Sequence, residues 1–184
     1  MKKLLLQPGN MLNTIKESLW TQFGASIDML ENAITSYPED HWDNNRKFFY
    51  IAYHTLVFLD YYLTIPHKNQ PASLPFTLAA SEDEIDPDAL DDIMPNSIYS
   101  KKELLDYLQL NREKCRQAIT GLTEESLEER WVEDGGDMNY AVLEILLYNM
   151  RHVQHHAAQL NMLLRRQMGD APGWVSRVNV RSAE

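Results

Sequence analysis

Cysteine is almost absent from this chain, whose 184 residues include only Cys115. A single cysteine has no intramolecular partner, so a disulfide framework is excluded and a reducing compartment is favoured. No apolar run approaches the ~18 residues that a membrane span needs. The apolar run at residues 4–6 is also well short of the ~7 to 15 residues of a signal-peptide core. We therefore expect a cytoplasmic protein that does not associate with membranes.

Basic residues are scarce as well. Acidic residues number 27 against 17 lysines and arginines, which gives a net charge of −10 at pH 7. A negative field repels phosphate backbones, so nucleic-acid binding is not expected. Seven of the acidic residues fall between Glu82 and Asp92. A run of this kind typically forms a solvated, negatively charged loop, and we favour that interpretation here.

The sequence has neither internal repeats nor the alternation of apolar and polar residues that is typical of strands. Apolar residues recur instead at helical spacing, and the length suits a single domain, 1–184. The first predicted helix follows residues 8–10, with Asn10 as its cap, and ends at Pro38. The second spans about residues 45–65. Because this second segment is apolar nearly all round, it should be the most buried helix.

A long connection follows the second helix, from Pro66 to Ser100. It contains five of the eight prolines as well as the acidic run, so we expect a loop with one short turn near residues 87–93. Connections of this length are unusual in compact domains and often cross over a bundle or cover a site. The sequence therefore predicts an all-α four-helix bundle with a long crossover connection between its second and third helices.

The third predicted helix begins after Ser100. Ser100 and Glu103 have the spacing of a capping box, in which each side chain satisfies a free backbone donor of the other residue. The helix should extend to about Ile119 and end at Gly121. Its predicted inward-facing residues are Leu104, Leu108, Cys115 and Ile119.

The fourth predicted helix occupies about residues 140–168 and ends at Gly169. A short turn at 123–129 and a loop at 134–137 precede it. Residues 173–184, at the end of the chain, have the composition of a loose tail.

Two of the six histidines, His152 and His156, are spaced four residues apart on the fourth helix. Neighbours at this spacing have Cβ atoms ~5 to 6 Å apart, which lets two imidazoles reach one metal ion. Apolar residues flank the pair, so the pair should face the bundle. His155 lies roughly opposite the apolar arc of the helix and should face solvent, and the alternative is that it supports a ligand imidazole without binding the ion. His41 and His67 are interpreted as surface residues.

His54 lies within the apolar second helix. Alone, a histidine in such a place is more often a core residue with a hydrogen-bond partner than a metal ligand. Beside a pair on another buried helix, the two interpretations are equally tenable.

Three histidine ligands would leave one position of the ion open, as in catalytic zinc sites, where bound water or a thiol becomes more acidic. Imidazole suits zinc, nickel, copper and iron alike.

No catalytic residue can be assigned from the sequence. Val153 follows His152 where the helical zinc-protease motif has a glutamate, so that motif is absent. Asp60 should point away from His54, because the two are about 240° apart around the helix. Asn149 and Gln159 could each orient a ligand imidazole or mediate an interhelical contact. Three tyrosines near His54 are more simply core residues than pocket residues: Tyr50, Tyr53 and Tyr61.

The segment at His54 reads Tyr-His-Thr-Leu-Val-Phe-Leu-Asp, and the later pair lies in Arg-His-Val-Gln-His-His-Ala-Ala-Gln-Leu. In their order and spacing, these motifs resemble the DinB/YfiT-like superfamily. The resemblance implies a four-helix bundle with non-sequential packing, often dimeric, in which His54, His152 and His156 bind nickel or zinc. Gln159 matches the glutamine of the family, but Ala157 and Ala158 stand where members often have Arg-Gly, which weakens any transfer of substrate preference.

The leading functional hypothesis is a divalent-metal-dependent enzyme that acts on a small molecule, as a thiol S-transferase or a hydrolase. Zinc or nickel would be its metal and a low-molecular-weight thiol a partner. The alternative is a metal- or ligand-binding stress-response protein without catalysis. A third hypothesis, an inert helical adaptor with core histidines, is also compatible with the sequence. A homodimer is a further expectation from the resemblance.

Overall fold

The computed structural model describes residues 8–44, 46–65, 74, 76–133 and 135–178. Its helices are α1 (Pro8–Ser36), α2 (Arg46–Tyr62), α3 (Lys101–Thr120), α4 (Glu124–Glu128) and α5 (Val142–Met168). A 3-10 turn, η1 (Glu39–Asn44), follows α1, and a second, η2 (Glu82–Glu84), lies in the crossover connection. The strands are β1 (Phe76–Leu78), β2 (Ile93–Pro95), β3 (Arg130–Val132) and β4 (Asn139–Ala141).

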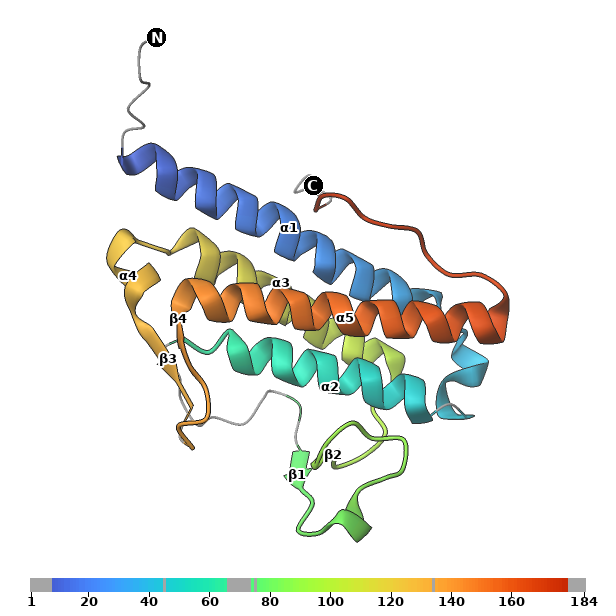
Figure 1. Cartoon of the computed structure of the whole chain (residues 1–184). Coiled ribbons are helices and arrows are strands. Elements are labelled where there is room, and N and C mark those ends of the chain that lie inside the picture. Colours follow the sequence, from blue (N-terminus) through green and yellow to red (C-terminus); the bar gives the residue numbers. More distant parts are fainter. Residues whose placement is uncertain (1–7, 45, 66–73, 75, 134, 179–184) are drawn as a thin grey trace.

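The four long helices form a bundle, which confirms the predicted class (Figure 1). The main partners of α1 are α5 and α3, and the same two helices are the main partners of α2. Helices α1 and α2, consecutive in the sequence, are therefore diagonal to each other in the bundle. This non-sequential order places α2 directly against α5, and those are the two helices that contain the predicted metal ligands.

The helix boundaries follow the local signals with small shifts. α1 begins at Pro8, so Asn10 lies inside the helix and its prediction as the cap was wrong. Proline suits the first helical turn, because its fixed φ fits the helix and its missing N–H is not needed there. The capping box of Ser100 and Glu103 is confirmed, and Gly121 caps the end of α3.

The core fills the space between the four helices, and α2 contributes most densely to it. Eleven of the 17 residues of α2 are buried, as its apolar composition predicted. The four predicted inward-facing residues of α3 are at most 1% exposed. None of the helices in the described ranges is long and apolar enough to cross a membrane.

The crossover connection contains a small antiparallel hairpin that was not predicted. β1 pairs with β2 in the register Phe76–Pro95, Thr77–Met94 and Leu78–Ile93. Strands of three residues are too short to display a recognisable alternation, which is why the sequence did not reveal them. The predicted turn is present at residues 87–88. The connection packs beside α2, where Arg46 and Asp86 form an ion pair at 2.8 Å.

A second unpredicted hairpin, β3–β4, lies between α4 and α5. Trp131 on β3 is completely buried, and its ring lies against Tyr61 and Tyr62 of α2 with centroid distances of 5.4 and 5.8 Å. Its indole N–H donates to the Thr64 carbonyl at 3.1 Å. This hairpin therefore packs over the C-terminal end of α2. The α5 helix ends at Gly169, whose φ of 78° is the left-handed conformation expected of a glycine cap.

After α5 the chain runs back along α1 (Figure 1). The N–H of Val178 donates to the Thr21 carbonyl at 3.0 Å, and Gln22 donates from its side chain to the Ser176 carbonyl at 3.3 Å. Gly24 permits this approach, because a Cβ there would lie 2.5 Å from a methyl group of Val178. Part of the segment expected to be a loose tail is thus attached to the bundle, and residues 179–184 lie outside the described ranges.

Candidate metal centre

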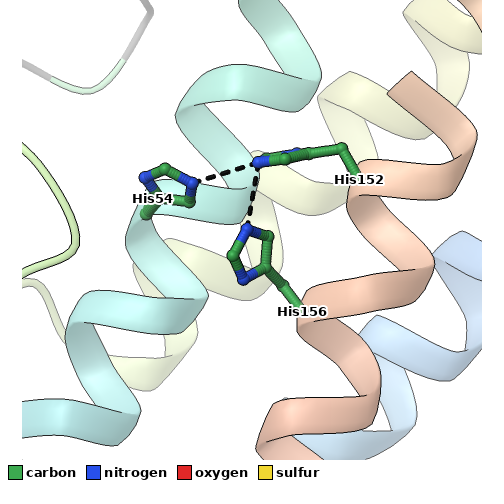
Figure 2. A group of neighbouring side chains, drawn as sticks. All are labelled: His54, His152 and His156. Atoms are coloured by element: carbon green, nitrogen blue, oxygen red, sulfur yellow. Dashed lines mark hydrogen bonds between the residues drawn. The ribbon is translucent and has the colours of Figure 1, made fainter. Parts of the chain in front are cut away.

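The three predicted histidines come together at the interface of α2 and α5. Figure 2 shows their rings pointing toward one another, His54 from α2 and the other two from α5. The Nε2 atoms of His54 and His152 are 3.0 Å apart, and those of His152 and His156 are 3.1 Å apart. One potential ligand atom from each residue lies within 4.8 Å of the others. Three imidazole nitrogens from distant parts of the chain thus converge on one small volume.

The site is largely shielded from solvent. His156 is 6% exposed, and the side chain of His54 is 14% exposed. Burial, reinforced by repulsion from the neighbouring imidazoles, lowers the pKa of His152 to about 3. Burial lowers the pKa of His156 to about 4, although its hydrogen bond to Gln159 acts in the opposite direction. At neutral pH these two rings are therefore uncharged, and an uncharged imidazole is the form that binds metals.

The other ring nitrogens of two histidines have acceptors. Nδ1 of His54 lies 2.6 Å from Oδ2 of Asp91, and Nδ1 of His156 lies 2.7 Å from Oε1 of Gln159. An ionised carboxylate or an amide oxygen only accepts, so both Nδ1 atoms donate their protons. In its neutral form each of these rings has only that one proton, so its Nε2 atom keeps a lone pair that is directed at the shared volume.

Nδ1 of His152 differs from these two, because it is buried without a hydrogen-bond partner among the described residues. Its ring is packed between aromatic side chains instead. The ring centroids of Phe58 and Tyr62, both on α2, lie 5.7 and 5.9 Å from that of His152. Phe58 also lies 4.6 Å from the His54 ring. These aromatic rings limit the rotation of two of the three histidines and so preserve their mutual orientation.

Asp91 was not identified by the sequence. Its acidic run was interpreted as a solvated loop, and that interpretation is wrong for this residue, whose side chain is only 24% exposed. The contact joins residues 37 positions apart, and no local pattern reveals such a pairing. Gln159 was a sequence candidate because it lies one turn after His156. Because the side chain of Gln159 is hydrogen-bonded to His156, Gln159 orients a clustered imidazole rather than mediating an interhelical contact.

The remaining predicted polar residues lie apart from the cluster. Asn149 donates to the Leu59 carbonyl at 3.0 Å, so it mediates an interhelical contact. Asp60 points away from His54, as expected, and binds Lys114 Nζ at 2.5 Å.

The other histidines and the tyrosines can be placed as well. His155 and His41 are exposed, as predicted, whereas His67 lies outside the described residues. Tyr50 and Tyr53 are buried core residues. The Tyr61 hydroxyl donates to Glu133 at 2.9 Å.

A shallow groove on the outer side of α5 reaches the cluster at His152. Its volume is about 480 Å³, and it is lined by Tyr148, Arg151, His152, Gln154, His155 and Ala158. One of the three histidines is therefore accessible from a surface depression large enough for a small molecule. His155, which does not join the cluster, lines this groove.

The family model of the DinB superfamily matches residues 22–160, which include all three clustered histidines. A search of the curated proteins found no match. The family match covers most of the chain and agrees with the helical bundle. The protein therefore belongs to the DinB superfamily.

Proposed function

We propose that this protein binds one divalent metal ion, zinc or nickel, through the Nε2 atoms of His54, His152 and His156. The convergence of these three nitrogens carries the proposal. The hydrogen bonds at Nδ1 leave Nε2 of neutral His54 and of neutral His156 with a lone pair, and each of these atoms lies 3.0 to 3.1 Å from Nε2 of His152. The low pKa values of His152 and His156 keep both rings neutral at neutral pH, and the neutral ring is the form that binds a metal ion.

The spacing also suits a metal ion. Two nitrogens that each lie ~2.0 to 2.1 Å from a tetrahedral ion are roughly 3.3 Å apart. The nearest Nε2 pairs are within a few tenths of an ångström of that separation. Among the described residues, the potential ligands at this place are three histidines, and the group includes no carboxylate. Neutral ligands leave the charge of the ion undiminished, which favours the activation of a bound nucleophile.

We further propose that the function is enzymatic, either the transfer of a low-molecular-weight thiol or hydrolysis of a small substrate. When bound, the ion would acidify a thiol or a water molecule at its open position. The chain supplies the rest: α2 and α5 hold the three imidazoles, Asp91 and Gln159 orient two of them, and Phe58 packs against the rings of His54 and His152. The groove beside His152 offers space for a small substrate.

Metal content tests the first half of the proposal. We expect the untagged protein to bind one zinc or nickel ion per chain by mass spectrometry after loading and desalting. His156→Ala should abolish stoichiometric binding, because it removes one of three ligands. His155→Ala is the matched control from the adjacent position of the same helix and should retain the ion. Failure of the wild type to bind, or equal losses in both variants, would refute the site.

Activity tests the second half. Thiol transfer is measured as thioether formation from a model alkyl chloride and candidate thiols, with the released chloride as the readout. Hydrolysis is measured with a panel of esters and amides. We expect one of these activities in the metal-loaded protein and its loss in His156→Ala. A loaded protein that is inactive toward both panels would refute the enzymatic assignment and support metal binding without catalysis.

A further inference from the structure

The crossover connection supplies a carboxylate to the histidine cluster. Asp91 lies just before β2, and its Oδ2 atom is 2.6 Å from Nδ1 of His54. Its other oxygen, Oδ1, accepts the backbone N–H of Ile93 at 3.0 Å. The two oxygens are thus divided between the backbone at the start of β2 and the imidazole on α2. This division fixes the direction in which each oxygen points.

We infer that Asp91 is a positioning residue that holds His54 in the tautomer with its proton on Nδ1, so that Nε2 is available as a metal ligand. The metal half of this inference rests on the proposed function, whereas the tautomer half does not. A neutral imidazole has one N–H, and the hydrogen-bond partner decides which nitrogen carries it. An ionised carboxylate only accepts, and it therefore selects the Nδ1–H form.

The same contact should affect the affinity of the site. A carboxylate that accepts the second N–H of a ligating histidine fixes the orientation of the ring and raises its basicity. Removal of such partners typically weakens metal binding by ~10 to 100-fold. The contact also links the long connection to the bundle, because Asp91 and its neighbour β2 belong to the connection and His54 belongs to α2.

Replacement of Asp91 by asparagine gives a specific expectation. The N–H of Ile93 still needs an acceptor, and only the amide oxygen of the new side chain can supply it. The amide nitrogen then faces His54 and donates, so Nδ1 must give up its proton and Nε2 must carry it. A proton on Nε2 occupies the lone pair that would bind the metal. A carboxylate-to-amide change beside a catalytic histidine of serine proteases acts in the same way.

A role confined to anchoring the connection leads to the opposite expectation. Asparagine preserves the hydrogen bond to Ile93 and is nearly the same size as aspartate. If Asp91 only held β2 in place, Asp91→Asn would leave both the His54 tautomer and the metal affinity at their wild-type values. The variant therefore separates positioning of the imidazole from simple support of the loop.

The tautomer can be measured without metal. Long-range proton–nitrogen correlation spectra of the ¹⁵N-histidine-labelled, metal-free protein at pH 8 distinguish the two tautomers, and His54→Gln assigns the His54 signals. We expect Nδ1–H in the wild type and Nε2–H in Asp91→Asn. Asp92→Asn, an exposed neighbour with the same charge change, should retain Nδ1–H. An Nδ1–H tautomer in Asp91→Asn would overturn the inference.

Zinc affinity, measured by competition with a chromophoric chelator, gives the second readout. We expect Asp91→Asn to weaken binding by ~10 to 100-fold and Asp92→Asn to leave it unchanged. Wild-type affinity in Asp91→Asn would overturn the link to the metal while the proposed function stands. A wild type that binds no zinc, together with the expected tautomer switch, would refute the proposed function and still support the role of Asp91 in setting the tautomer.

Discussion

Gln159 provides a quantitative test of how the site is supported from within α5. Its Oε1 atom accepts the Nδ1 proton of His156 at 2.7 Å, and His156 is 6% exposed. Gln159→Leu removes this acceptor and replaces one good helix former by another. The buried N–H would lose this hydrogen-bond partner, and loss of a partner costs a buried polar group ~1 to 3 kcal/mol.

The expected loss of metal affinity follows from the same contact. Removal of an outer hydrogen-bond partner weakens metal binding by ~10 to 100-fold, which corresponds to about 1.4 to 2.7 kcal/mol. This range agrees with the cost of the unpaired N–H. We would measure zinc affinity by chelator competition at fixed pH and ionic strength, and the helical content by circular dichroism. The affinity should fall while the helical content stays at the wild-type value.

Gln154→Leu is the matched control for this experiment. It makes the same substitution on the same helix, where the side-chain amide donates to the sulfur of Met29 at 3.3 Å rather than to a clustered histidine. Its zinc affinity should equal that of the wild type. Wild-type affinity in Gln159→Leu, or equal losses in the two leucine variants, would show that the hydrogen bond to His156 does not support the site.

Three further predictions concern the bundle. Cys115 is completely buried, and burial raises the pKa of its thiol. At pH 8 this thiol should therefore react only slowly with a disulfide reagent until the protein is unfolded. Rapid reaction of the native protein would contradict this burial. Gly24→Ala would place a Cβ 2.5 Å from a methyl group of Val178 and should displace the C-terminal segment from α1. Limited trypsin digestion should then cleave after Arg177 faster than in the wild type. Ser100→Ala removes a capping box and should lower the free energy of unfolding by ~1 kcal/mol in urea, and an unchanged midpoint would exclude a stabilising cap.

The parts of the fold that the sequence predicted depend on local signals. The helices are long enough for their apolar periodicity to be recognised, and the capping box of Ser100 and the terminal Gly169 mark their ends. The two hairpins are invisible at this level because their strands have three residues each. Trp131 gives no local sign of its burial, which results from its contact with the end of α2.

In the candidate site, too, the residues that share one helix could be predicted from local spacing, and the residues from other elements could not. His152, His156 and Gln159 lie within two turns of one helix, so their spacing alone placed them on one side of it. His54 required the contact between α2 and α5, which the resemblance to a known family implied and helical periodicity alone did not. Asp91 could not be predicted, because the acidic run indicates a solvated loop and only the tertiary fold brings Asp91 to His54.

We expect three imidazoles from α2 and α5 to hold one metal ion. The sharpest test is a crystal of the zinc-loaded protein, with anomalous differences recorded at the zinc edge. One strong peak per chain should lie ~2.0 to 2.1 Å from Nε2 of each of His54, His152 and His156. A map with no peak at this position, or with its zinc bound at the acidic residues 82–92 instead, would refute the three-histidine site.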